Sequence, residues 1–408
     1  MFLLENDTVP FKALCYTVGE CNYGGRVTDD KDRISLTTIL DLFYGDAFLQ
    51  EGSSITPSGL YKVPPDGSYP DYCAFIEGLP IVAPPEVFGL DDNATLTKDQ
   101  KETNDLFRTV LLCGGGSGGG GDAGKDATVD AVASDVLAKL PKPFDMAEAE
   151  VKYPVLFEES MNTVICQELT KYNRLINAIS TTLKTTRRAI KGLVVMSAEL
   201  EELSNQLYFG TIPAMWLKKS YGSLKPMAGY FTDLLKRIDF FEAWLHGAPP
   251  LVFWISGFFF THAFTTGAKQ NFARKYTIPI DAVDFDQLML PKEVAHYTKK
   301  PKDGVYTHGL FFEGGRWNKK TETLTERQPK VLFTTAPLMW FVPMRVTELP
   351  PRLHYNCPVY KTSDRRGILA TTGHSTNFVT FIRVPIAEGD KAAHWVLRGC
   401  AMLTQLDD

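Results

Sequence analysis

The hydrophobic pattern changes its period near residue 275, and that change limits the folds open to this protein. Before this point, apolar residues recur at three- and four-residue steps within 162–189, 196–207 and 224–246, which predicts amphipathic helices. After it, short β-type runs alternate with turn residues. These runs cover 305–313, 331–335, 338–346, 359–362, 378–384 and 395–403. Helices followed by strands predict a segregated α+β fold rather than a βαβ sheet.

The same pattern divides the sequence into three blocks, which cover residues 1–140, 141–275 and 276–408. The first block alternates proline-rich turns with predicted helices at 33–48, 97–112 and 126–140. The second block is expected to be mostly helical, and the third to be rich in strands. A chain of 408 residues is long enough for two or three domains.

The composition argues against several kinds of partner. The formal net charge is −5, whereas domains that bind nucleic acid are usually basic, so no nucleic-acid partner is expected. The strongest apolar stretch, Leu251–Phe260, is about half as long as a membrane-spanning helix, and no membrane partner is expected. The N-terminal residues lack the basic lead of a secretory signal. The seven cysteines include no CxxC pair, which predicts neither a disulfide framework nor a zinc site.

A glycine-rich run at 114–121 leads into a sequence that matches a phosphate-binding loop. Gly119, Gly124 and Lys125 satisfy the GxxxxGK pattern, in which backbone N–H groups and the lysine bind phosphates. The next position should carry a serine or threonine for magnesium, but here it is Asp126, whose carboxylate would repel phosphate. We therefore favour a flexible linker, with a loop near 114–125, and keep the nucleotide-binding loop as an alternative.

Other polar patterns are better explained by backbone geometry than by chemistry. Asp29, with Asp30 and Asp32 after it, is positioned to cap the helix expected near Arg33. The glycine pair Gly24–Gly25, directly before Arg26, suits a tight turn.

Three further patterns in the second and third blocks also favour structure over chemistry. Trp254 and Gly257 belong to an aromatic run that we interpret as core, in which the glycine allows close packing. The run Gly314–Trp317, which contains Arg316, predicts a hairpin turn or a bulge. Gly373–Asn377 nearly matches the GxSxG nucleophile pattern but lacks its last glycine and is interpreted as a polar turn. His374 and His394 have no metal-ligand spacing around them.

Several unusual strings occur in a characteristic order along the sequence, and together they resemble the C-terminal end of a dynein heavy chain of the axonemal type. In the N-terminal third they are Pro10–Leu14, Glu20–Asp30, Pro85–Leu90 and Asn93–Ala94. Further along they are Phe253–Phe260, Gln270–Tyr276 (which contains Arg274), Gly309–Trp317, Cys357–Thr362 and Gly373–Phe378. The resemblance covers nearly the whole sequence.

The resemblance implies an architecture. Residues 1–140 would form the helical lid of the sixth, degenerate AAA+ module, with the glycine-rich run as a variable loop. Residues 141–275 would form the helical part of the C-terminal domain, and 276–408 an antiparallel, β-barrel-like part. In the family this domain packs on one face of the AAA+ ring, braces it and can tune its movement.

The resemblance also implies a function for which this chain supplies no catalytic residue. The parent would be an ATP-hydrolysing microtubule motor of a cilium or flagellum, placed in the cytoplasm, the cytoskeleton and the axoneme. ATP and Mg²⁺ would bind in the parent motor, with no cofactor and no metal in this fragment. Its partners would be the remaining AAA+ ring of the same heavy chain and, through the motor, microtubules. The residues singled out for structural or interface roles are Gly24, Gly25, Arg26, Asp29, Trp254, Gly257, Arg274, Arg316 and Trp317.

Two other functions stay open at this point. The protein could bind a nucleotide through Gly119–Lys125 used as a phosphate-binding loop. It could also be a partner-binding module whose strand edges, in the β-rich tail at 276–408, recruit another protein.

Overall fold

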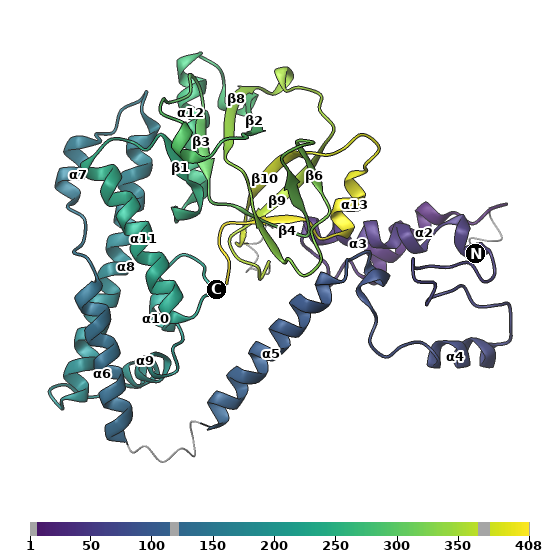
Figure 1. Cartoon of the computed structure of the whole chain (residues 1–408), viewed down its shortest axis with the longest axis horizontal. Coiled ribbons are helices and arrows are strands. Elements are labelled where there is room, and N and C mark those ends of the chain that lie inside the picture. The colour runs from purple at the N-terminus through teal and green to yellow at the C-terminus, as the bar shows by residue number, and fades with distance from the viewer. Residues whose placement is uncertain (1–5, 115–121, 366–375, 408) are drawn as a thin grey trace.

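The fold is α+β, as the sequence predicts, with helices in the first two thirds of the chain and most strands in the last third (Figure 1). The structure is a computed structural model that describes residues 6–114, 122–365 and 376–407. The glycine-rich run from 115, with Gly119, and the polar turn at 373–375 lie outside these residues.

The N-terminal segment is built from short helices joined by turns. Its α-helices are α2 (Phe11–Thr17), α3 (Asp30–Phe43), α4 (Tyr69–Glu77) and α5 (Asn93–Gly114). A π-helical turn at Val18–Asn22 and 3₁₀ turns at Asp46–Leu49 and Pro85–Phe88 lie between them. Figure 1 shows α5 extending away from the other N-terminal helices toward the end of the molecule that holds α6 and α9.

The central helical block is organised around one long helix. Its helices are α6 (Asp122–Lys139), α7 (Met146–Lys152), α8 (Ser160–Ile190), α9 (Ala198–Tyr208), α10 (Ala214–Leu217) and α11 (Met227–His246). The stripe predicted for α8 is buried along its length, including Ile165, Leu169, Leu175, Ile179 and Leu183. Because these residues recur every three or four positions, they form one face of the helix, against which α6, α9, α11 and α12 pack.

The strands form three sheets. The first has four strands in the order β1 (Val252–Trp254), β3 (Val305–His308), β8 (Met339–Arg345) and β2 (Val283–Met289). The second has five, in the order β10 (Phe378–Pro385), β9 (His354–Tyr360), β11 (Ala401–Leu403), β4 (Phe311–Glu313) and β7 (Phe333–Thr335). The third is a hairpin of β5 (Arg316–Asn318) and β6 (Thr323–Thr325).

The β-rich part differs in two ways from an antiparallel barrel. Most strand pairs are antiparallel, but β1 pairs with β3 and β11 with β9 in parallel. Within the described residues none of the three sheets closes on itself, so the barrel-like detail of the prediction is not confirmed.

One hydrophobic core joins the helical block to the β-rich part. The cluster runs from Val129 in α6 to Met402 in β11. Its centre is aromatic: Phe241 of α11 lies 5.2 Å from Tyr172 and 5.4 Å from Phe258, measured between ring centroids. Helix α12 (Thr261–Lys275) packs against α8 on one side and the first sheet on the other, which fixes the two parts together.

Local element types differ from the sequence prediction in several places. The run 395–403, predicted as β-type, contains the end of helix α13 (Ala392–Leu397) and then β11, with Gly399 at φ +61° between them. Strands β2, β5 and β6 lie outside the predicted runs, and β1 lies in a block predicted to be helical. Short apolar runs do not distinguish a buried strand from a buried helix, and these elements are defined by their neighbours in the sheet.

Candidate functional interface

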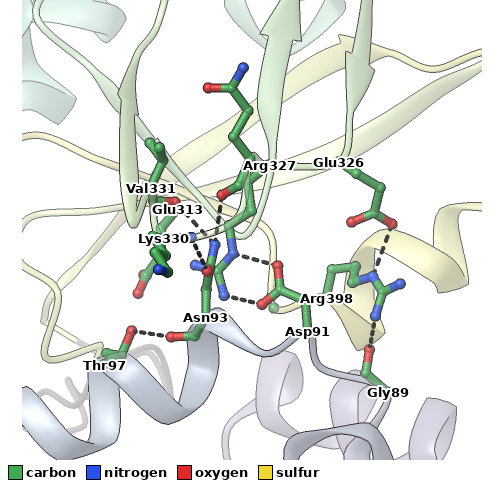
Figure 2. A network of polar contacts seen from close by, with 12 residues as sticks. Gly89, Asp91, Asn93, Thr97, Glu313, Glu326, Arg327, Lys330, Val331 and Arg398 are labelled. Carbon is green, nitrogen blue, oxygen red and sulfur yellow. Dashed lines mark hydrogen bonds and ion pairs between the residues drawn. The ribbon is translucent and has the colours of Figure 1, made fainter. Parts of the chain in front are cut away.

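The N-terminal segment meets the β-rich part through a network of polar contacts (Figure 2). One side of this interface is Gly89–Asn93, which follows the 3₁₀ turn Pro85–Phe88 and opens α5. The other side is the loop Glu326–Val331 between β6 and β7, together with Arg398 at the end of α13. The two sides are more than 230 residues apart in sequence, so only the tertiary fold brings them together.

The strongest contact is a two-pronged ion pair between Asp91 and Arg327. Arg327 Nε donates to Asp91 Oδ2 at 2.6 Å, and Arg327 Nη2 donates to Asp91 Oδ1. The arginine side chain is only 5% exposed, and the aspartate 23%. A planar guanidinium that meets both oxygens of a carboxylate forms charge-assisted hydrogen bonds about twice as strong as neutral ones. Such a pair fixes orientation as well as distance.

Asn93 uses its whole side-chain amide in the same interface. Its Nδ2 donates to the carbonyl oxygens of Gln328 at 2.9 Å and Val331 at 3.2 Å, while its Oδ1 accepts from the backbone N–H of Lys330 at 2.7 Å. The residue is buried. Lys330 has a positive φ of 65°, which is uncommon for a residue with a side chain. The asparagine thus adds three hydrogen bonds to a tight loop whose own backbone contact is the Val331 N–H donating to the Gln328 carbonyl at 3.2 Å.

A third contact involves Arg398. Its Nη1 donates to the carbonyl oxygen of Gly89 at 2.9 Å, and its Nε donates to Glu326 Oε1 at 2.9 Å. His394 Nε2 lies 2.6 Å from the same carboxylate oxygen. Gly89 has φ +75°, and a Cβ there would come within 2.9 Å of Leu397 Cβ. Any larger residue at this position would both strain the backbone and push α13 away.

The interface continues along α3. Helix α3 packs against α13, and Lys31 Nζ lies 4.0 Å from the centre of the Phe378 ring, within the range of a cation–π contact. The N-terminal segment therefore contacts the β-rich part at two places, through α3 and through the opening of α5.

Two family models match this chain. The model of the C-terminal domain of dynein heavy chains matches residues 100–404, and the model of the AAA lid domain of dynein heavy chains matches residues 1–94. The chain belongs to the dynein heavy chain family.

The relatives agree with this family. The chain is 50% identical over 408 residues to dynein axonemal heavy chain 3 of Mus musculus and spans 10% of it. It is 48% identical over 410 residues to dynein axonemal heavy chain 12 of Mus musculus, spanning 13%, and 45% identical over 408 residues to dynein axonemal heavy chain 1 of Homo sapiens, spanning 10%. All of this chain is matched each time, so it spans about a tenth of the length of these relatives.

The interface just described lies between the regions that the two family models match. Asp91 and Asn93 fall in the lid match, and Arg327 and Arg398 in the C-terminal domain match. We call it the lid interface below.

The sequence-predicted residues of the lid lie near its N-terminal end. Asp29 is the N-cap of α3, where its Oδ1 accepts from the backbone N–H of Lys31 at 2.9 Å. A Cβ at Gly24 would collide with the Glu20 carbonyl oxygen, whereas one at Gly25 would meet nothing within 4 Å. The backbone N–H of Arg26 closes the turn by donating to the Tyr23 carbonyl at 2.8 Å.

Gly257 is buried in the C-terminal domain, and the partly buried ring of Trp254 lies against it. A Cβ at Gly257 would come within 2.9 Å of the Trp254 ring, so the glycine permits this packing. Gly309, at φ +102°, lies between β3 and β4 and contacts the same ring. Tyr172 Oη donates to the Gly257 carbonyl at 2.6 Å, which ties α8 to this turn.

Arg274 lies apart from the lid interface, whereas Arg316 and its neighbour Trp317 lie in β5, and Arg316 contacts Glu326 of that interface. Arg274 of α12 donates to the Phe157 carbonyl and to Ser160 Oγ at 2.8 Å, at the start of α8. Arg316 Nε donates to the Glu326 carbonyl at 2.9 Å within the β5–β6 hairpin, and Trp317 packs partly buried against the main core.

The glycine pair before Arg316 is not the hairpin turn that the sequence predicts. Strand β4 pairs with β11 and β7, whereas β5 pairs with β6, so the pair is a corner between two sheets. A Cβ at Gly314 would come within 2.7 Å of the Arg398 carbonyl oxygen, which explains the small residue at this corner.

Of the sequence that matches a phosphate-binding loop, Gly124 and Lys125 are described and Gly119 is not. Gly124 and Lys125 lie in the first turn of α6. The Lys125 ammonium donates to Asn205 Oδ1 of α9 at 2.6 Å, so it holds two helices together. This contact gives the lysine a structural role within the helical block.

The residues that make the lid interface were not found by sequence reasoning. Asp91, Asp92 and Asn93 signal a helix start, and such residues usually cap their own helix. In the structure Asp91 and Asn93 instead bind a loop from the other end of the chain. A single sequence carries no signal for this pairing, because the partners are neither periodic nor close in sequence.

Two searches of the described residues bear on other kinds of site. They contain no group of three or more histidine, cysteine or acidic side chains that could hold a metal ion. No described helix is both long and apolar enough to cross a membrane.

Proposed function

We propose that this chain is a non-catalytic structural and regulatory region of an axonemal microtubule motor. In this proposal it packs on the AAA+ ring of its own heavy chain and tunes the ring's movement. The support comes from the family to which the chain belongs and from relatives whose names describe axonemal heavy chains. The regulatory part rests on the lid interface.

The observation that carries the proposal is the part-buried Asp91–Arg327 ion pair, with the buried Asn93 beside it. A movement of the lid must either break these contacts or move the C-terminal domain with it. Removing one member of a buried ion pair leaves an uncompensated charge, so the contacts resist separation. The interface therefore couples the two regions mechanically, which is what a brace requires.

The partners and cofactors of this proposal lie outside the 408 residues. The lid and the C-terminal domain contact the remaining AAA+ ring, and microtubules are reached through the parent motor in the axoneme of a cilium or flagellum. ATP and Mg²⁺ bind elsewhere in the parent, with no nucleic acid or membrane as a partner.

The test uses the intact heavy chain. Arg327→Lys keeps the positive charge but removes the planar fork, which weakens the coupling. We expect a changed microtubule-gliding velocity with little change in ATP turnover in the absence of microtubules. The matched control is Arg345→Lys, at an arginine that lies half-exposed and 3.9 Å from Glu348. An unchanged velocity in Arg327→Lys would contradict the regulatory role.

The two alternative functions make different predictions. If Gly119–Lys125 bound a nucleotide, the protein would retain radiolabelled ATP and Lys125→Ala would lose it. If the β-rich tail recruited a partner, capture from ciliary extract would depend on residues 276–408 and not on the lid. Either result would replace the brace proposal.

A further inference from the structure

A cavity of about 100 Å³ lies where the helical block meets the β-rich part. The helical block contributes Ser220–Gly222 and Arg237 of α11 to its wall, and the β-rich part contributes Lys361 and Thr404–Gln405. In the same measure, one water molecule needs roughly 10–15 Å³, so the cavity has room for a small polyatomic molecule. Its wall comes from segments far apart in sequence and is almost entirely polar on the β side.

Lys361 gives the wall a positive charge that has no counter-ion among the described residues. It directly follows β9 and is half-buried. Burial lowers the pKa of its ammonium group, and no described carboxylate forms an ion pair with it. A desolvated charge is costly unless something pairs with it. The wall therefore favours a negatively charged occupant.

Two buried polar atoms in the wall lack a hydrogen-bond partner among the described residues. They are the hydroxyl oxygen of Tyr221, a residue 7% exposed, and Oε1 of Gln405, a residue 5% exposed. The Gln405 amide nitrogen is occupied, because it donates to the Gly222 carbonyl. Burial raises the pKa of Tyr221 well above its ordinary value, so its hydroxyl keeps its proton and can donate. The wall thus offers two donors, Lys361 and Tyr221, and one acceptor, Gln405.

Other titratable groups near the cavity already have protein partners. Arg237 stacks 3.8 Å from the centre of the Tyr221 ring and pairs with Asp233 at 2.7 Å, so it holds the tyrosine in place. Glu168 binds the backbone N–H groups of Phe259 and Phe260 at 2.8 and 2.9 Å. His262, whose pKa is lowered by burial and by Lys361, completes the titratable groups near the cavity.

We propose that this cavity binds a hydrogen phosphate ion. The ion's oxygens accept from Lys361 and Tyr221, and its own hydroxyl donates to Gln405 Oε1. Sulfate has the same shape but carries no proton at neutral pH, so it cannot donate a hydrogen bond to Gln405 Oε1. A bound ion would connect the helical block to the β-rich part and would stiffen the C-terminal domain across this seam.

The test is titration of the purified 408-residue chain with inorganic phosphate, followed by calorimetry at constant ionic strength. We expect saturable binding, and weaker binding of sulfate. Lys361→Met removes a charge-assisted hydrogen bond and should weaken phosphate binding at least about tenfold. Tyr221→Phe removes one hydroxyl and should weaken it by a smaller factor. Lys184→Met, at an exposed lysine of α8, should leave binding unchanged.

Each variant needs a melting curve without phosphate to show that it folds. If Lys361→Met does not fold, Tyr221→Phe and the preference for phosphate over sulfate carry the test. A phosphate carried on a side chain is the other source of the same chemistry, and O-phosphoserine is the probe for it. Equal or tighter binding of O-phosphoserine, equal binding of sulfate, absence of saturation, or unchanged affinity in the substituted proteins would overturn the proposal.

Discussion

The lid and the C-terminal domain are held together in different ways. Among the described apolar side chains before residue 115, only Cys15 and Leu40 are buried. The C-terminal domain, by contrast, has a hydrophobic cluster that runs without interruption from Val129 to Met402. The lid helices leave large apolar side chains exposed, such as Tyr69 and Ile76. Buried apolar area supplies most of the stability of a domain. A segment that buries so few apolar side chains must therefore be held in place by its contacts with neighbouring parts of the protein.

What the lid contacts within this protein is mostly polar. The lid interface depends on one ion pair, one buried amide and Arg398, with only small apolar contacts such as Gly89 against Leu397. Polar contacts add little net stability but fix geometry closely. The comparison indicates that the C-terminal domain is a rigid body and the lid an attachment whose orientation is specified more strongly than its stability.

The largest expected effect lies in the core of the C-terminal domain. Phe241 is fully buried among aromatic rings, so Phe241→Ala should lower the free energy of unfolding by about 3–5 kcal/mol. The matched control is Phe107→Ala on α5, where the ring is exposed and the change should stay within about 0.5 kcal/mol. Denaturant unfolding followed by far-ultraviolet circular dichroism, which reports on helices in both parts of the chain, measures both. Similar losses for the two would contradict the contrast between the regions.

The next effect is a pH dependence confined to the C-terminal domain. Glu168 is 1% exposed, and burial raises its pKa from 4.5 to about 7, against the lowering effect of its hydrogen bonds to Phe259 and Phe260 and of Arg237. The unfolded chain releases this proton near pH 4.5 and the folded chain near pH 7. Stability from this group is therefore complete below the lower value and is lost as pH rises to the upper one, by about 3 kcal/mol.

Glu168→Gln isolates this contribution, because glutamine does not titrate. The difference in unfolding free energy between the parent protein and Glu168→Gln should change by about 3 kcal/mol between about pH 5 and about pH 8. The parent should lose stability relative to the variant as pH rises. A difference that stays constant over this range would show that Glu168 is ionised in the folded protein at low pH.

A smaller effect is expected at the lid interface. Asn93→Ala removes three hydrogen bonds between the buried Asn93 side chain and the Gln328–Val331 loop, which costs about 2 kcal/mol. Hydrogen exchange should show faster opening of α5 and of that loop, with the aromatic core unaffected. Asn104→Ala, at an exposed position of the same helix, is the control. If the core opened equally, lid and domain would unfold as one unit and the comparison would fail.

The smallest effect concerns a helix cap within the lid. Asp29→Ala removes the acceptor for the Lys31 N–H and should destabilise α3 by about 1 kcal/mol. Asp30→Ala leaves the cap in place. It should cost only a few tenths of a kcal/mol, because it removes a carboxylate that interacts favourably with the helix dipole. Exchange rates of the first-turn amides of α3 report the difference. Equal protection of these amides in the two variants would show that the Asp29 cap does not stabilise the start of α3.

The sequence predicts well what depends on periodicity. The stripes of α8 and α11, the Asp29 cap and the order of helices before strands all follow from patterns within a few residues. Strand β2, the parallel pairing of β1 and the helix within 395–403 do not, because short apolar runs take their form from neighbours in the sheet. The partners of Asp91 and Asn93 lie more than 230 residues away, beyond the reach of any local pattern.

The central claim is that the lid is coupled to the C-terminal domain through the Asp91–Arg327 pair. A double-mutant cycle with Asp91→Asn and Arg327→Gln, followed by native-state hydrogen exchange at residues 85–97, measures that coupling directly. The account predicts a coupling free energy of about 2 kcal/mol, the value expected of buried charge-assisted hydrogen bonds. Single and double variants whose effects add to within about 0.5 kcal/mol would contradict it.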